Sequence, residues 1–187
     1  LYLRGSENGQ KVDDKRVISS VNRCLNPYEK AGYEAMMELA ASDELEIIVS
    51  NTTEAGIQYD PSCKKDDCPP SSFPAKLTQV LYHRYQAGKK GIIMLACELI
   101  DNNGKELLKC VNQYIEQWGL EDGFKKYVNE DCTFCGSLVD RIVPGRIRDE
   151  KEVAELEQKH GYTDSLLDVG EVFGVWVIEG DEKLNDV

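Results

Sequence analysis

Three short apolar runs, separated by segments with helical spacing, constrain the fold of this chain more than any other feature. They lie at Leu45–Val49, Gly91–Cys97 and Ser137–Val143. Between the first two, apolar residues recur three and four positions apart: Leu77, Val80, Leu81 and Tyr85. Strands that alternate with helices favour a mainly parallel sheet with helices on both faces. We therefore predict an α/β fold in which the three runs are neighbouring, parallel strands, with Leu45–Val49 buried on both faces.

Shorter elements are predicted around this sheet. Two strands, at Leu1–Arg4 and Val17–Val21, flank a turn, and a last strand covers Val172–Ile178. Helices are predicted at Tyr28–Ala41 and Asp149–His160. The second of these helices is highly charged, and we interpret its charges as a solvated face.

The charge of the chain argues against one broad class of function. Among 187 residues, 34 are acidic and 22 are basic, so the net charge is −12 and no basic patch offers a surface for nucleic acid. The apolar runs are far shorter than a membrane span, and no signal peptide opens the chain. Seven irregularly spaced cysteines indicate reduced thiols and a cytoplasmic protein. Because Leu1 stands in the middle of an apparent strand, we expect a piece of a larger protein.

Polar clusters accompany the carboxyl ends of all three predicted strands. Ser50–Gly56 follows the first strand, Glu98–Gly104 follows the second, and Asp140 with Arg141 lies within the third. Ligands of such sheets bind outside the carboxyl ends of the strands. We therefore expect the three clusters to meet at one edge, where a ligand binds.

Each cluster also has a purely structural interpretation. Thr and Asn are common turn residues. Asn103, with Glu106 three positions later, is typical of a helix capping box. Asp140 and Arg141 can form a local ion pair at the end of a strand. The residues alone leave these alternatives open.

Several segments together resemble one family of enzymes. The segments are VSNTTEAGI (Val49–Ile57), SVNRCLNPY (Ser20–Tyr28), FPAKLT (Phe73–Thr78), CELID (Cys97–Asp101) with Asn103-Gly104, and VDRIVPG (Val139–Gly145). In this order they are similar to the mannitol dehydrogenase family of long-chain polyol dehydrogenases. Mannitol-type members usually carry Cys-Asp-Asn where this chain has Cys97-Glu98-Leu99. This departure favours the branch of the family that acts on hexuronates.

The resemblance implies a Rossmann-like domain and an NAD-dependent oxidoreductase. The reaction it implies is hydride transfer between NAD(H) and a sugar acid, with tagaturonate and altronate as the expected pair. Fructuronate and mannitol-type polyols are the alternatives. The implied partner is therefore a small-molecule substrate, with neither nucleic acid nor membrane, and the oligomeric state stays open.

The resemblance also assigns roles to five residues. It implies that Thr53 and Glu54 lie near the nicotinamide end of the cofactor, and that Val139 and Asp140 lie close to the nicotinamide and the substrate. Asn103 is expected to donate its amide N–H to the substrate oxygen, which would stabilise the negative charge that develops as the hydride arrives.

Two parts of the family pattern are missing from these residues. No G-x-G-x-x-G sequence occurs, so we expect the glycine-rich turn that binds the pyrophosphate to lie upstream of Leu1. The catalytic lysine of the family is expected downstream of Val187, in a helical domain. Residues 1–187 would then be the later part of an NAD-binding domain, inactive alone and a poor binder of NADH.

The cysteines support one alternative of a different class, a metal or interaction module. Cys132-x2-Cys135 and Cys63-x4-Cys68 have spacings near those of zinc or redox sites. Cys135, however, runs directly into the third predicted strand, whereas a redox cysteine is typically placed at a helix N-terminus. No zinc-ribbon turn flanks either pair, and we predict no metal site. The histidines, His83 and His160, are interpreted as structural or solvent-facing.

Overall fold

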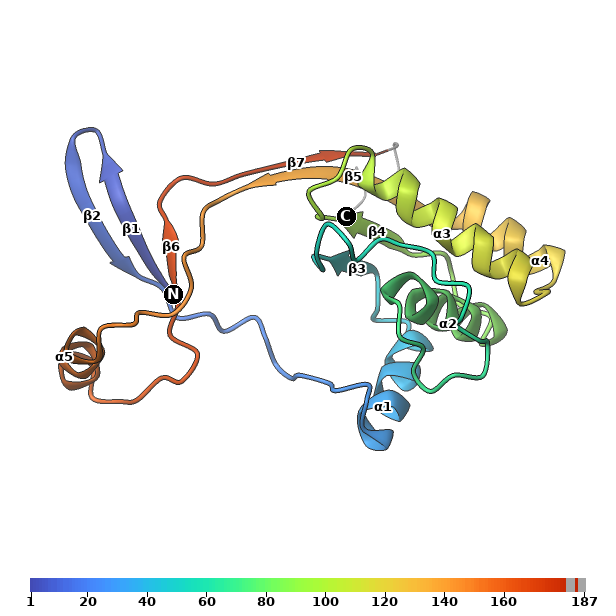
Figure 1. Ribbon diagram of the computed structural model, residues 1–187, viewed down its shortest axis with the longest axis horizontal. Coiled ribbons are helices and arrows are strands. Elements are labelled where there is room, and N and C mark those ends of the chain that lie inside the picture. Colours follow the sequence, from blue (N-terminus) through green and yellow to red (C-terminus); the bar gives the residue numbers. More distant parts are fainter. Residues whose placement is uncertain (181–183, 185–187) are drawn as a thin grey trace. The chain divides into compact units, whose positions relative to one another are not determined.

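The computed structural model describes residues 1–180 and residue 184. The chain folds into two compact units (Figure 1). Unit 1 combines Leu1–Arg23 with Val139–Trp176, and unit 2 combines Cys24–Leu138 with the chain from Val177 onward.

A four-stranded sheet with the order β3-β4-β5-β7 organises unit 2. Its strands are β3 (Ile47–Ser50), β4 (Ile93–Ala96), β5 (Thr133–Asp140) and β7 (Val175–Glu179). β3 pairs with β4 in parallel, with Ser50 opposite Ala96, and β4 pairs with β5 in parallel, with Ile93 opposite Thr133. The prediction of three neighbouring, parallel strands is therefore confirmed.

The helices of unit 2 connect these strands. They are α1 (Lys30–Ala40), α2 (Phe73–Gln86), α3 (Asn103–Gln117) and α4 (Asp122–Lys126), which continues into the π-helical turn η1 (Tyr127–Asp131). The start of α2 follows from local chemistry, because Ser72 accepts a hydrogen bond from the N–H of Ala75 at 3.2 Å and Pro74 occupies the first turn.

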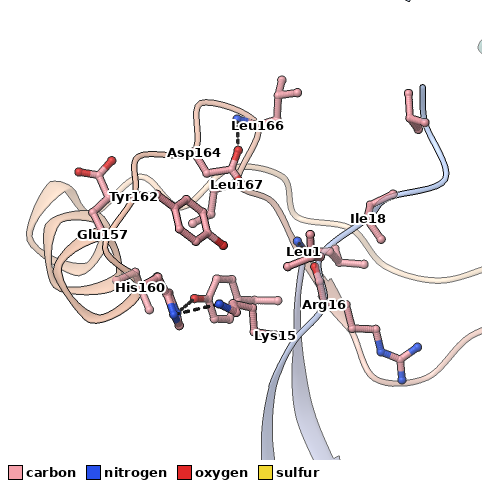
Figure 2. A pocket seen from close by; sticks show the side chains of 14 residues that line it. Leu1, Lys15, Arg16, Ile18, Glu157, His160, Tyr162, Asp164, Leu166 and Leu167 are labelled. Carbon is pink, nitrogen blue, oxygen red and sulfur yellow. Dashed lines mark hydrogen bonds between the residues drawn. The ribbon is translucent and has the colours of Figure 1, made fainter. Parts of the chain in front are cut away.

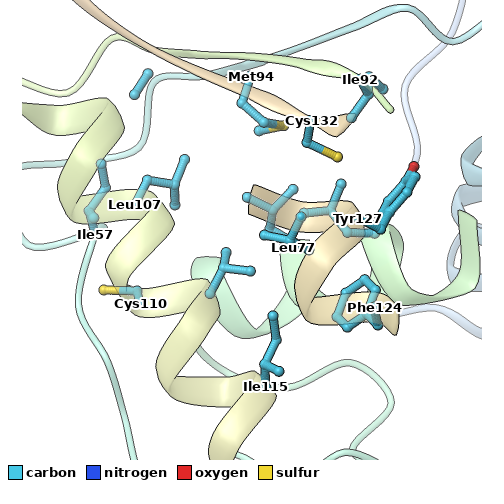
Figure 3. Close-up of a cluster of buried hydrophobic side chains, with 14 residues drawn as sticks. Ile57, Leu77, Ile92, Met94, Leu107, Cys110, Ile115, Phe124, Tyr127 and Cys132 are labelled. Carbon is cyan, nitrogen blue, oxygen red and sulfur yellow. The ribbon is translucent and has the colours of Figure 1, made fainter. Parts of the chain in front are cut away.

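The main core lies between β4 and the helices α2, α3 and α4 (Figure 3). Alternate residues of the β4 region, Ile92, Met94 and Ala96, enter this cluster, as the two-residue period of a strand requires. On the helices, residues three and four positions apart fill it: Leu77, Leu81, Leu107, Val111 and Ile115. The core thus holds the carboxyl end of β4 and the start of α3 firmly together.

Unit 1 is built on a hairpin formed by β1 (Tyr2–Glu7) and β2 (Gln10–Lys15). Asn8 and Gly9 connect these strands with φ angles of 52° and 77°, and an Asn-Gly pair at positive φ is the preferred two-residue hairpin loop. β6 (Val169–Glu171) pairs in parallel with β1, and α5 (Glu150–His160) is the helix of this unit.

The hairpin corrects the prediction of a strand at Val17–Val21. That segment is exposed and outside any strand. The polar sequence Gln10–Lys15 takes its place, because the Asn-Gly turn sets the register and pairing with β1 does not require an apolar face. The apolar composition of Val17–Val21 alone therefore did not locate the second strand of the hairpin.

Three strand predictions need further correction. β3 is the edge of its sheet and Val49 is 52% exposed, so this strand is not buried on both faces. β5 starts at Thr133, earlier than predicted, because residues Thr133–Cys135 pair with Ile93–Leu95 of β4. The strand predicted at Val172–Ile178 begins three residues later, because β7 covers Val175–Glu179.

Candidate functional site

The carboxyl ends of β3 and β4 lie side by side and lead into the first two predicted clusters. The ladder between the two strands extends to the N–H of Cys97, which donates to the carbonyl of Ser50 at 2.8 Å. Below this edge, the Ser137 hydroxyl of β5 donates to the carbonyl of Ala96 at 2.6 Å. The three strands are therefore joined at the edge where parallel sheets bind ligands.

Glu98 is buried at the centre of this edge, with 3% of its surface exposed. Its carboxyl group accepts hydrogen bonds from the Ser50 hydroxyl at 3.0 Å, the Thr52 hydroxyl at 2.9 Å and the Thr52 N–H at 3.1 Å. Glu98 thus links the end of β4 to the loop that follows β3. Our sequence analysis gave this residue no role, and the only signal was its departure from the Cys-Asp-Asn pattern of mannitol-type members.

Asn103 is equally buried, with 2% of its surface exposed, at the first position of α3. Its Nδ2 donates to the carbonyls of Glu98 at 2.9 Å and Ser137 at 2.8 Å. Its Oδ1 accepts from the N–H groups of Gly104 at 2.9 Å and Ser137 at 3.0 Å. Both amide hydrogens are therefore engaged with the main chain.

The alternative interpretation of Asn103 and Glu106 as a capping box is wrong. The N-cap of α3 is Asn102, which has a left-handed backbone (φ 54°, ψ 39°) and makes no side-chain cap hydrogen bond. Asn103 is already helical, and its side chain reaches across to β5. The close approach of the two elements explains Gly104 as well, because a Cβ there would come within 2.7 Å of the Gly136 nitrogen.

Thr53 and Glu54 lie on the exposed loop after β3. A turn that Gly56 closes, with its N–H donating to the Thr53 carbonyl at 2.7 Å, shapes this loop. Thr52 packs so closely on Gly56 that a Cβ there would overlap the Thr52 hydroxyl. The side chains of Thr53 and Glu54 are thus presented to solvent by a loop whose backbone is held at Thr52 and Gly56.

Val139 and Asp140 belong to unit 1, whereas Thr53, Glu54 and Asn103 belong to unit 2. The meeting of Val139 and Asp140 with the other predicted residues therefore stays a prediction. Arg141 donates from Nε to the carbonyl of Phe173 at 3.0 Å. It forms no ion pair with Asp140 within the described residues, so the local ion-pair alternative is not supported.

The groups at this edge suit one end of a dinucleotide better than the other. The exposed Thr53 hydroxyl and Glu54 carboxyl are neutral and acidic groups of the kind that bind ribose hydroxyls and carboxamides. A pyrophosphate instead needs a glycine-rich turn at a helix N-terminus, and this sequence has no G-x-G-x-x-G. The chemistry of these two side chains is compatible with the nicotinamide and ribose end of NAD, and their role there stays a prediction.

A cavity of about 460 Å³ in unit 1 is a second candidate, but none of the predicted site residues lines it (Figure 2). His160 lies at its wall, where Nε2 contacts the Tyr2 hydroxyl and Nδ1 lies 3.0 Å from the Lys15 nitrogen. Burial, followed by the positive charges of Lys15 and Lys159, lowers the pKa of His160. These contacts agree with a structural role for this histidine.

The metal-module alternative receives no support from the described part of the chain. No group of three or more His, Cys, Asp or Glu side chains comes together there to hold a metal ion. Cys132 and Cys135 are buried in the sheet region, and burial raises the pKa of the Cys132 thiol. A reactive redox cysteine requires the opposite shift.

The family comparison decides between these interpretations. The family model described as the mannitol dehydrogenase Rossmann domain matches residues 1–186. The chain belongs to the mannitol dehydrogenase family. This membership confirms the resemblance noted in the sequence and the Rossmann-like α/β fold.

Relatives with curated names are similar over almost the whole chain. The chain is 44% identical to the altronate oxidoreductase of Phocaeicola vulgatus over 98% of its length. It is 45% identical to the protein of the same name from Bacillus subtilis and 46% identical to that from Klebsiella pneumoniae, each over 97% of its length. The chain spans 38% of the length of each of these relatives.

Solved structures agree on the fold. The mannitol 2-dehydrogenase of Pseudomonas fluorescens, solved as a ternary complex with NAD and D-mannitol, has a TM-score of 0.76 at 22% identity over 95% of this chain and 37% of its own. A D-sorbitol dehydrogenase in substrate-free form has a TM-score of 0.62 at 23% identity over 79% of this chain and 32% of its own. In the described part of the chain, no helix is both long and apolar enough to cross a membrane.

Proposed function

We propose that the protein containing this chain is an NAD-dependent oxidoreductase that transfers a hydride between NAD(H) and a hexuronate, with tagaturonate and altronate as its substrate pair. The observation that carries this proposal is the 44–46% identity, over nearly all of the chain, to proteins named altronate oxidoreductase. The solved NAD complex of a structural relative supports the choice of cofactor. The free cysteines support a cytoplasmic location, where thiols stay reduced.

In this proposal, the cofactor supplies the hydride when it is bound. Thr53 and Glu54 bind its nicotinamide end, because their exposed side chains follow the edge strand β3 at the carboxyl end of the sheet. Val139 and Asp140 contribute from the end of β5. These roles are proposed from position and family membership together.

Asn103 is proposed to stabilise the substrate oxygen, under one structural condition. Its two amide hydrogens are held by the carbonyls of Glu98 and Ser137. To donate to a substrate, Nδ2 must exchange one of these acceptors for the substrate oxygen. An uncharged amide suits this task, because it stabilises developing negative charge without exchanging protons itself. The proton must then come from another group.

A substrate panel on the purified full-length protein tests the proposal. NADH consumption is followed with tagaturonate, fructuronate and fructose, and with NADPH in place of NADH. We expect kcat/KM for tagaturonate to exceed that of each competitor by about tenfold or more. Preference for fructuronate or fructose would assign the protein to another branch of the family, and the absence of turnover with all three would reject the proposal.

A further inference from the structure

A continuous set of hydrogen bonds crosses the edge of the sheet beneath the proposed cofactor loop. It runs from Thr52 to the carboxyl group of Glu98, from the Glu98 carbonyl to Asn103, and from Asn103 to Ser137 of β5. Each step joins a different element, so the loop after β3 is connected through this set to β4, α3 and β5.

A glutamate is uncommon at such a buried position. A buried carboxyl group is costly unless its oxygens are hydrogen-bonded. Here the donors are the Ser50 hydroxyl and both the hydroxyl and the N–H of Thr52. Among the ion pairs of the described residues, Glu98 takes part in none. Its partners are therefore neutral groups, and two of the three belong to Thr52.

The double contact with Thr52 restricts the loop immediately before Thr53. The main-chain contact fixes the position of the Thr52 peptide, and the side-chain contact fixes its rotamer. Gly56 then packs against Thr52 and closes the turn with Thr53. Among the described residues, the side chains of Thr53 and Glu54 form no hydrogen bond or ion pair, and both residues are exposed. Their placement therefore depends on the residues on either side.

We propose that Glu98 is a positioning residue for cofactor binding, which holds the loop after β3 so that Thr53 and Glu54 face the nicotinamide end of NAD. This inference rests on the function proposed above. Glu98 itself lies beneath the loop and reaches the cofactor only through Thr52. A loop that is held less well binds its ligand less tightly, because the apparent affinity falls in proportion to the fraction of molecules in the competent conformation.

Four variants of the full-length protein test this role. Glu98→Ala removes all three contacts, and Thr52→Val removes only the hydroxyl contact. Glu98→Gln keeps the length of the side chain and an oxygen that can accept both bonds from Thr52. Thr78→Val is the matched control, since the buried Thr78 hydroxyl donates to the Pro74 carbonyl within α2, away from the sheet edge.

The first readout is hydrogen exchange of the amides of residues 52–56 in the protein without cofactor. We expect exchange to accelerate about tenfold or more in Glu98→Ala and by a smaller factor in Thr52→Val. Glu98→Gln is expected to restore most of the protection, and Thr78→Val to leave this segment unchanged. Because this readout needs no turnover, it decides the positioning role even if the proposed reaction is wrong.

The second readout is the KM for NADH compared with kcat. If the fraction of molecules with a binding-competent loop falls to a tenth in Glu98→Ala, the KM for NADH should rise about tenfold. We expect a smaller rise in Thr52→Val, and in both variants kcat should change less than KM. If Glu98→Ala fails to fold, both measurements are made on Thr52→Val.

Unchanged exchange in residues 52–56 in a folded variant would overturn the positioning role. Faster exchange with an unchanged KM would overturn its link to the cofactor.

Discussion

Asn103 and Ser137 are hydrogen-bonded to each other in both directions: the Asn103 amide donates to the Ser137 carbonyl at 2.8 Å and accepts from the Ser137 N–H at 3.0 Å. This pairing resembles the exchange of two bonds between neighbouring strands. Its position is informative, because the ladder between β4 and β5 ends at Leu95 and Cys135. The Asn103 side chain therefore continues the pairing along β5 beyond the last residue pair of the β4–β5 ladder.

We predict that Asn103→Asp destabilises the protein by about 2–4 kcal/mol, because a carboxylate leaves the carbonyls of Glu98 and Ser137 without their donor. If Asn103 served only as a helix cap, the free energy of unfolding would change little, since Asp caps a helix as well as Asn. Urea unfolding of the full-length protein measures the difference. Asn102→Gly is the control, and we expect a change within about 0.5 kcal/mol because Gly accepts the left-handed backbone there.

For catalysis, we predict that Asn103→Ala lowers kcat by roughly 10²–10³ in the protein that remains folded. The measurement must be made on protein whose folded fraction has been determined, since the same substitution removes contacts to the main chain. A kcat near the parental value in the folded fraction would restrict Asn103 to its structural role.

The protonation of His160 provides a pH prediction. Its pKa is lowered by burial and then by Lys15 and Lys159, so the folded state favours the neutral ring. Stability from this group is complete above the unfolded-state value of about 6.5 and is lost as the pH falls below it. NMR titration should place the His160 ring below its ordinary range, and Lys15→Gln should raise its pKa. A His160 that titrates above about 6.5 would contradict this assignment.

The cysteines should differ sharply in reactivity towards a thiol-alkylating reagent. Cys24 and Cys68 are exposed, whereas Cys110 and Cys132 are buried and burial raises the pKa of both buried thiols. We predict that the exposed pair reacts first in the native protein and that the buried pair reacts only on unfolding. Mass spectrometry of peptides after timed alkylation measures the order. Rapid labelling of native Cys132 would revive the redox alternative.

Packing of α3 against β4 is tested by Leu107→Ala. The side chain is fully buried, and its truncation is expected to cost about 2–5 kcal/mol. Leu166→Ala is the matched control, because this leucine is 86% exposed and its loss should change the free energy of unfolding by less than about 0.5 kcal/mol. Equal effects of the two substitutions in urea unfolding would contradict the assigned core.

Periodicity predicted the parallel sheet because apolar alternation and helical spacing are local properties of the chain. The same argument failed at Val17–Val21, where the Asn8-Gly9 turn selected the polar neighbour Gln10–Lys15 as the second strand of the hairpin. It also misplaced β5, whose start is fixed by pairing with β4 rather than by composition.

In the candidate site, too, some features could be predicted from the sequence and others could not. The positions of Thr53, Glu54 and Asn103 near strand ends follow from the order of elements. The engagement of Asn103 with Ser137 and the contacts of Glu98 with Thr52 are formed by residues distant in sequence. No local pattern reveals such contacts, and Asn103 therefore resembled a cap. The link between Val139 or Asp140 and the other residues stays a prediction.

The most direct test of the proposed site is the footprint of NADH on the full-length protein, measured by hydrogen exchange with and without the cofactor. We predict that NADH slows exchange in residues 51–56 and at the end of β5, near Val139 and Asp140, while the outer turns of α2 are unaffected. Protection confined to other regions, with residues 51–56 exchanging at the same rate in both states, would contradict the assignment of this edge as the cofactor site.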